Sequence, residues 1–203
     1  MIAATANILK ELDNESAARA LNKTLRNEPD LVAVQEWGRD RRDLLPDEYA
    51  WSGGMPIGVH PTWGDLLISR TVLVSRARGD ARASRATEAL ILRGRRLHIV
   101  LNVHLLAHHD EPANLAGWRE GIQWIEDWVA GIQRYQPKVQ PWVMGDVNKH
   151  NLRIEGLTSC WKGNPLLPTF RERTIDGIWT NKKANAARVI KTPSDHHSAL
   201  ATY

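Results

Sequence analysis

The sequence predicts an α/β fold, in which strands buried on both faces are combined with helices that are apolar along one side. The near-continuous apolar runs at 31–36 and 141–146 are typical of strands covered by other layers on both faces. Residues 114–135 instead have the period of a helix with one buried stripe, because their apolar side chains recur at steps of three and four. These patterns alone also permit a doubly wound sheet. The stripe consists of Leu115, Trp118, Ile122, Ile125, Val129 and Ile132.

The other elements follow from the same patterns and from the turn residues between them. Residues 15–28 are predicted to be a helix that Pro29 ends. The turn at 93–95 is predicted to join two strands as a hairpin. Because no linker, repeat or low-complexity segment interrupts the chain, we expect one domain over residues 1–203. The predicted strands are 2–9, 31–36, 49–52, 66–69, 72–76, 88–92, 97–103, 141–146, 174–179, 189–191 and 198–202.

Charge and composition favour a globular protein with a polyanionic ligand. The net charge is +4 and the isoelectric point about 9.4, a balance that attracts phosphate groups. Basic residues gather at 39–42, 70–85, 93–96 and 182–183, and a solvated surface explains each cluster about as well. Cys160 is the single cysteine, so no intrachain disulfide can form. No secretion signal or membrane span is evident, and we expect a cytoplasmic protein.

Acidic, amide and imidazole side chains recur where the predicted strands end. Strand ends are where side chains converge in α/β folds, and carboxylate and amide oxygens suit Mg²⁺, Mn²⁺ or Ca²⁺. One cysteine and scattered histidines argue against a structural zinc site. Each residue alone has an ordinary structural explanation, such as a turn, but the ordered set is hard to assign to chance. The set is Asn7, Glu36, His104, Asp146 with Asn148, Asp176, and Asp195 with His196.

Six segments of the chain resemble the successive motifs of the endonuclease/exonuclease/phosphatase superfamily, and they span nearly the whole sequence. The resemblance implies a four-layer α/β sandwich, with two mixed β-sheets packed face to face and helices outside, as in DNase I-like proteins. The segments are 5–8 (Thr-Ala-Asn-Ile), 29–36 (Pro-Asp-Leu-Val-Ala-Val-Gln-Glu), 102–105 (Asn-Val-His-Leu), 145–148 (Gly-Asp-Val-Asn), 174–178 (Thr-Ile-Asp-Gly-Ile) and 194–197 (Ser-Asp-His-His).

The resemblance also implies a metal site and a histidine that contacts phosphate. Glu36 is expected to be the principal ligand of a Mg²⁺ ion, for which Mn²⁺ can substitute, with Asn7 and Asp195 as further ligands. His196 is expected to contact the scissile phosphate, and Asp176 to hydrogen-bond to that histidine. A protonated imidazole would stabilise the charge of the transition state and a neutral one would act as a base, and the sequence leaves both open.

The remaining roles complete an in-line hydrolysis. Asp146 is expected to orient or deprotonate the attacking water, and Asn148 to donate a hydrogen bond to a phosphate oxygen. His104 resembles a second histidine that contacts phosphate or acts as an acid. Its candidate partner is Glu88, at the start of the preceding predicted strand.

These roles predict a Mg²⁺-dependent phosphodiesterase, and a nuclease acting on DNA or RNA is the first hypothesis. Trp37, Trp51 and Trp63 would then be stacking surfaces for bases, or else core residues. One alternative is a phosphatase or phosphodiesterase for a small or lipid phosphoester. Another is an inactive domain that only binds. We expect no membrane association and no obligate protein partner. His108 and His109 are expected in a loop without a catalytic role.

Overall fold

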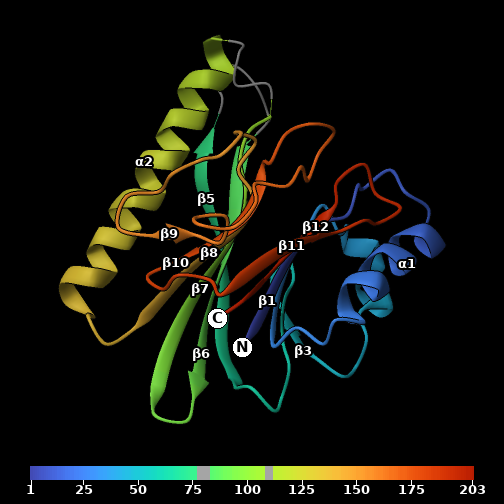
Figure 1. Ribbon diagram of the computed structural model, residues 1–203, viewed down its shortest axis with the longest axis horizontal. Helices are drawn as coiled ribbons and strands as arrows, with labels where there is room; N and C mark the ends of the chain where they lie inside the picture. The colour runs from blue at the N-terminus through green and yellow to red at the C-terminus, as the bar shows by residue number, and fades with distance from the viewer. Residues whose placement is uncertain (77–82, 108–111) are drawn as a thin grey trace.

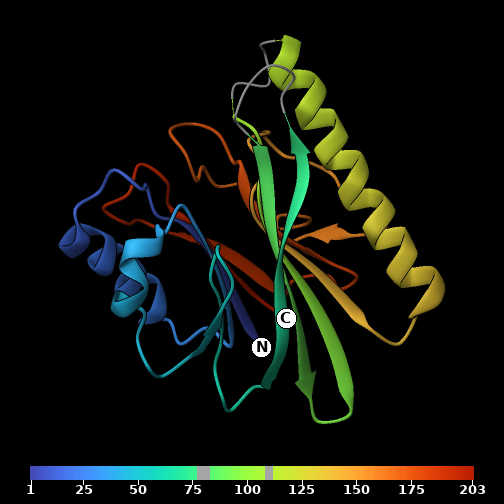
Figure 2. The same cartoon turned by 180° about the vertical axis from the view of Figure 1, so that it is seen from behind.

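The computed structural model describes residues 1–76, 83–107 and 112–203. His108, His109 and part of the basic cluster at 70–85 therefore lie outside the described residues. Within these ranges, twelve strands form two mixed six-stranded sheets packed face to face, with helices on the outer faces (Figure 1). Seen from behind, the helical layers again lie on opposite sides of the paired sheets (Figure 2). The predicted four-layer α/β sandwich is confirmed.

The first sheet holds both ends of the chain, with β1 between a parallel and an antiparallel neighbour. β1 pairs in parallel with β2, and α1 (Asn14–Leu25) lies between them in sequence. It pairs antiparallel with β12, so residues far apart in sequence become neighbours. In spatial order the strands are β11 (Ala186–Ile190), β12 (Ser198–Thr202), β1 (Ile2–Asn7), β2 (Leu31–Gln35), β4 (Ile57–Val59) and β3 (Ala50–Ser52).

The second sheet is antiparallel except for β7 and β8, which α2 (Pro112–Tyr135) connects in parallel. Two short strands predicted at 66–69 and 72–76 are one strand, β5, with register irregularities against β6. β6 begins at Ala83, five residues before the predicted start at Glu88. In spatial order the strands are β5 (Asp65–Arg76), β6 (Ala83–Arg93), β7 (Arg96–His104), β8 (Gln140–Asp146), β10 (Asp176–Thr180) and β9 (Thr158–Ser159).

Helix α1 and the 3₁₀ helix η1 (Arg39–Leu44) cover the first sheet. The carboxylate of Asp13 caps α1 by accepting a hydrogen bond from the Ser16 amide at 2.7 Å. The helix ends at Leu25, three residues earlier than predicted. Glu28 adopts a left-handed backbone with φ 48°, which cannot continue a right-handed helix.

Helix α2 covers the second sheet along an apolar stripe, as its period predicted. Ile125 and Val129 pack against Leu101, Val103 and Val143 on the outer face of β7 and β8. Neither α2 nor any other helix in the described ranges is long and apolar enough to cross a membrane.

The space between the sheets changes from apolar to polar towards one edge. Because successive side chains point to opposite faces of a strand, Thr5, Gln35 and Asn102 all face the partner sheet close to the strand ends. Thr5 Oγ1 donates to Gln35 Oε1 at 3.2 Å, and Gln35 Nε2 donates to Asn102 Oδ1 at 2.6 Å. This buried hydrogen-bonded layer joins the two sheets directly beneath the predicted site residues.

Candidate active site

A pocket of about 220 Å³ opens at the edge where β1, β2, β7 and β8 end and where β10 begins. Every predicted site residue except Glu88 either lines this pocket or contacts a residue that does. Residues that are far apart in the sequence therefore lie together in one pocket. The pocket is lined by Glu36, His104, Ala107, Asp146, Asn148, Phe170, Arg173, Ile175, Asp195 and His196.

Asn7 connects the side of the pocket formed by the first sheet with the side formed by the second. Its Nδ2 donates to Glu36 Oε1 at 3.1 Å and to Asp146 Oδ2 at 3.0 Å, so one amide bridges a carboxylate of each sheet. Its Oδ1 is buried and has no hydrogen-bond partner among the described residues. Glu36 has a left-handed backbone with φ 55°, which costs on the order of 1 kcal/mol for a residue other than glycine. Strain of this kind is common at functional sites.

Asp176 and His196 form a buried pair across the seam between the sheets. Asp176 begins β10 of the second sheet, whereas His196 precedes β12 of the first. His196 Nδ1 lies 3.0 Å from Asp176 Oδ2. Burial alone would lower the pKa of His196, but the hydrogen bond and charge of Asp176, with the charges of Asp146 and Asp195, raise this pKa to about 9. At neutral pH the imidazole is therefore charged, and Nδ1–H donates to Asp176.

The pKa of Asp146 is also raised, which for a carboxyl group favours the neutral form. Asp146 is 1% exposed, and its Oδ1 accepts a hydrogen bond from the Asn148 amide at 2.7 Å. Burial and, second, the charge of Asp176 raise the pKa of Asp146 to about 6, against the opposing charges of His104 and His196. A carboxyl group with a pKa near neutrality is suited to accept a proton from water.

His104 lies between two carboxylates, neither of which is the predicted partner. Its Nε2 is 3.6 Å from Glu36 Oε1 and 3.9 Å from Asp146 Oδ2. Glu88 pairs in register with Leu101 and accepts a hydrogen bond from Trp128 Nε1 of α2 at 2.9 Å. Its side chain thus lies on the helix-covered face of the sheet. The structure does not bring Glu88 to His104, because the two side chains have opposite parity along their paired strands.

Asn148 and Asp195 lie at the rim of the pocket. Asn148 is half-buried with φ 53°, a left-handed backbone that asparagine tolerates, and its Nδ2 donates to Leu105 O at 2.9 Å. Asp195 is exposed and accepts a hydrogen bond from Ser194 Oγ at 3.3 Å. Ser194 Oγ also accepts from the His196 amide at 3.3 Å, which fixes the segment that carries both residues.

Sequence reasoning missed a hairpin at 169–173 that closes one side of the pocket. The Phe170 ring lies 4.6 Å from the His196 ring, measured between centroids, and Arg173 lines the pocket. Thr169 is fully buried, and its hydroxyl accepts hydrogen bonds from the amides of Ile175 and Asp176. The only signal in the sequence was the closeness of these residues to Asp176.

The donors around the pocket fit a hard divalent cation. Glu36, Asp146, Asp176 and Asp195 place four carboxyl groups around one cavity, and a divalent cation would offset their mutual repulsion. The buried, unpartnered Oδ1 of Asn7 is an oxygen suited to such an ion.

A second group of donors lies close by but fits a metal ion less well. Donor atoms of Asp146, Asp176 and His196 lie within 4.8 Å of one another. A metal ion bound to His196 at this position would have to displace a proton from the charged imidazole. The end of the pocket around Glu36 and Asn7 therefore fits the ion better.

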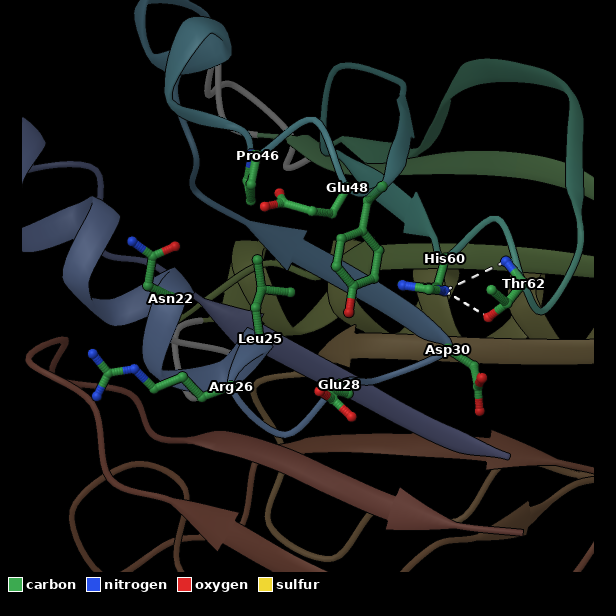
Figure 3. A pocket seen from close by; sticks show the side chains of 10 residues that line it. Asn22, Leu25, Arg26, Glu28, Asp30, Pro46, Glu48, His60 and Thr62 are labelled. Atoms are coloured by element: carbon green, nitrogen blue, oxygen red, sulfur yellow. Dashed lines mark hydrogen bonds between the residues drawn. The ribbon is translucent and has the colours of Figure 1, made fainter.

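A larger hollow of about 720 Å³ lies elsewhere, beside the end of α1 (Figure 3). Its wall carries the carboxylates of Glu28, Asp30 and Glu48, with His60 hydrogen-bonded to Thr62. None of the predicted site residues lines it, so size alone does not identify the candidate site.

The three tryptophans predicted as stacking surfaces are mainly structural. Trp37 and Trp63 are 2% and 5% exposed and belong to the core, which excludes a stacking role for both. Trp51 is half-buried, and its Nε1 donates to Pro46 O at 2.8 Å.

Comparison with known proteins gives no match to a family model and no match among curated sequences. Solved structures, in contrast, superpose over nearly the full chain. TDP2 from D. rerio, complexed with a single-strand DNA product, is 14% identical with a TM-score of 0.76, covering 99% of this chain and 97% of that one. An endonuclease/exonuclease/phosphatase from Bacteroides vulgatus is 18% identical with a TM-score of 0.76, covering 98% and 97%.

The catalytic domain of human nocturnin, with a bound sulfate anion, is 18% identical with a TM-score of 0.70, covering 99% of this chain and 93% of that one. At these identities the likeness concerns the fold. The chain therefore has the DNase I-like fold of the endonuclease/exonuclease/phosphatase superfamily, as the motifs in its sequence indicated.

Proposed function

We propose that this protein is a Mg²⁺-dependent phosphodiesterase that hydrolyses nucleic acid by in-line attack of an activated water. The observation that carries the proposal is the convergence of Asn7, Glu36, Asp146, Asp176 and His196, contributed by both sheets, on one pocket. The solved structures of similar fold support it, because TDP2 from D. rerio was seen with a single-strand DNA product.

In the proposed reaction Asp146 accepts a proton from the attacking water as the water oxygen bonds to phosphorus. The opposite P–O bond breaks, and the leaving oxygen takes up a proton from solvent. The raised pKa of Asp146, near 6, leaves it ionised at neutral pH yet basic enough to take the proton. Protonated His196 donates its Nε2–H to a non-bridging phosphate oxygen, where negative charge develops. Asn148 and His104 border the same space and would supply further hydrogen bonds to the phosphate.

Glu36, Asn7 and Asp195 would hold the Mg²⁺ ion. When bound, this ion supplies Lewis acidity to the phosphoryl oxygen and offsets the repulsion between the substrate and the acidic pocket. The strained backbone of Glu36 and the unpartnered oxygen of Asn7 support this assignment. Mn²⁺ shares the preference for oxygen ligands and is the expected substitute.

The rim of the pocket favours a polymeric anion over a small phosphoester. Lys10, Lys149, Arg171 and Arg173 are exposed on the loops that carry the site residues. Arg173 lines the pocket itself, whereas Lys10, Lys149 and Arg171 are not among the lining residues and would contact phosphates that flank the one being cut. A small phosphomonoester has no flanking phosphates and would gain nothing from this arrangement.

The test is a cleavage assay on labelled single-stranded DNA, duplex DNA and RNA of one sequence, with bis(p-nitrophenyl) phosphate as a small diester. The matched control is Asp146→Asn, purified in the same way, because it keeps the shape of the side chain and removes the base. We expect cleavage of at least one polymer that needs Mg²⁺, stops with EDTA and is lost in the variant.

Two other outcomes would reject the proposal. Hydrolysis of the small diester alone would indicate a phosphodiesterase for small or lipid phosphoesters. No hydrolysis at all, with retained binding of a labelled oligonucleotide, would indicate a domain that only binds.

A further inference from the structure

We infer that Thr169 is a positioning residue that sets the geometry of the Asp176–His196 pair, an inference that rests on the proposed function. Asp176 belongs to the second sheet and His196 leads into the first. Their hydrogen bond therefore depends on how the two sheets are held together at this point. Thr169 is hydrogen-bonded to both sides of the seam between the sheets.

On the Asp176 side the contact is made by the hydroxyl group. Thr169 Oγ1 accepts hydrogen bonds from the backbone amides of Ile175 and Asp176, each at 3.1 Å. The carbonyl of Asp176 is held from another direction by Trp161 Nε1, at 3.2 Å. The peptide groups on both sides of the Asp176 side chain are therefore fixed.

On the His196 side the contacts come from the backbone and from the next residue. Thr169 O accepts a hydrogen bond from the His197 amide at 2.6 Å. Phe170 forms a β-bridge with His196 and places its ring 4.6 Å from the imidazole, with 36° between the planes. Thr169 thus holds the backbone at Asp176 through its hydroxyl, and Thr169 and Phe170 hold the segment of His196 through backbone and ring contacts.

The hydroxyl is the part of this arrangement that a single change can remove. Thr169 is 0% exposed, so its replacement by valine keeps the volume but leaves two buried amides without their acceptor. Those amides relax by moving the start of β10, and Asp176 moves with them. A displacement well below 1 Å is enough to weaken a hydrogen bond of 3.0 Å and to misplace the imidazole.

The matched control is Thr174, another buried threonine of the same segment. Its hydroxyl donates to Leu167 O at 2.7 Å and contacts neither Asp176 nor His196. Thr174→Val therefore removes a buried hydroxyl hydrogen bond without touching the pair. Thr169→Ser is the conservative variant, since it keeps the hydroxyl that accepts the two amides.

The experiment measures kcat and KM for the polymer that the wild-type protein cleaves, at a temperature where melting curves show every variant folded. For Thr169→Val we expect kcat to fall at least tenfold with KM within about twofold, as for a misplaced catalytic group. Thr169→Ser and Thr174→Val should stay within about threefold of the wild type. Equal losses in the two valine variants would show a general effect of stability and overturn the inference.

A second measurement does not depend on activity. The proton on His196 Nδ1 that is bound to Asp176 should give a low-field imidazole signal in the NMR spectrum of the metal-free protein, lost in His196→Gln. We expect that signal to vanish or move in Thr169→Val and to persist in Thr174→Val. An unchanged signal in Thr169→Val overturns the inference even if the wild type cleaves no substrate, an outcome that would reject only the proposed function.

Discussion

Replacing Asp176 by asparagine should move both limbs of the pH–activity profile in the same direction. The substitution keeps the shape of the side chain and an acceptor for His196 Nδ1, 3.0 Å away, but it removes the charge. That charge raises the pKa of His196 and also that of Asp146. Without it, both pKa values fall.

The size of the effect follows from the pKa values. The wild type should be active between limbs near 6, where Asp146 loses its proton, and near 9, where His196 loses its own. A histidine with a pKa of about 9 is about 97% protonated at pH 7.5, whereas one at the ordinary value of about 6.5 is about 9% protonated. The variant should therefore lose about tenfold in kcat at pH 7.5 from protonation alone.

The assay is kcat at saturating Mg²⁺ from pH 5 to 10 for wild type and Asp176→Asn. Both limbs should shift to lower pH in the variant. The ratio of its kcat to that of the wild type should therefore be highest near pH 5 to 6. A profile that keeps its alkaline limb near 9 and only falls in height would refute the reasoning about His196. An acid limb that moves upward would refute the reasoning about Asp146.

Three further perturbations test other parts of the structure. Glu36→Gln should weaken Mg²⁺ binding at least tenfold by isothermal titration without lowering the melting temperature of the metal-free protein, and unchanged affinity would remove Glu36 as a ligand. Gly145→Ala should cost roughly 2–4 kcal/mol in urea unfolding, because a Cβ there would lie 2.1 Å from Val103 O with φ 136°; a loss below about 0.5 kcal/mol would contradict this. Burial, and more weakly the charge of Arg93, lowers the pKa of His98 to about 4. The stability that neutral His98 contributes is therefore complete above the unfolded pKa of about 6.5 and is lost as the pH falls through 4. The total loss is about 3 kcal/mol. His98→Gln should lose less stability than the wild type between pH 7 and pH 4, and equal losses would argue against a buried neutral imidazole.

The sequence was most informative where an apolar run ends in a polar residue. The runs before Glu36 and Asp146 are strands, and both side chains lie at the predicted pocket. Alternation along a strand shows which residues share a face, but not which strands share a sheet. The pairing of β1 with β12 is seen only in the structure.

The errors have specific physical causes. Glu88 was placed near His104 because the strand was taken to begin there, whereas β6 starts at Ala83 and its register turns Glu88 towards α2. Thr169 and Phe170 were missed because the segment between β9 and β10 has no period that distinguishes inward from outward side chains. Their importance comes from contacts with Asp176 and His196, which no local pattern encodes.

The pairing of β1 with β12 also has a consequence for folding. Ile2 lies opposite Thr202, so the central strand of the first sheet lacks one neighbour until nearly all of the described chain is available. Contacts this distant in sequence slow folding, because the loop between them must close first. Until β12 pairs with β1, the backbone amides and carbonyls along that edge of β1 are unpaired, and another chain can bind to them. Asp195 and His196 lie on the segment that leads into β12, so the same late step that protects this edge from aggregation also completes the pocket.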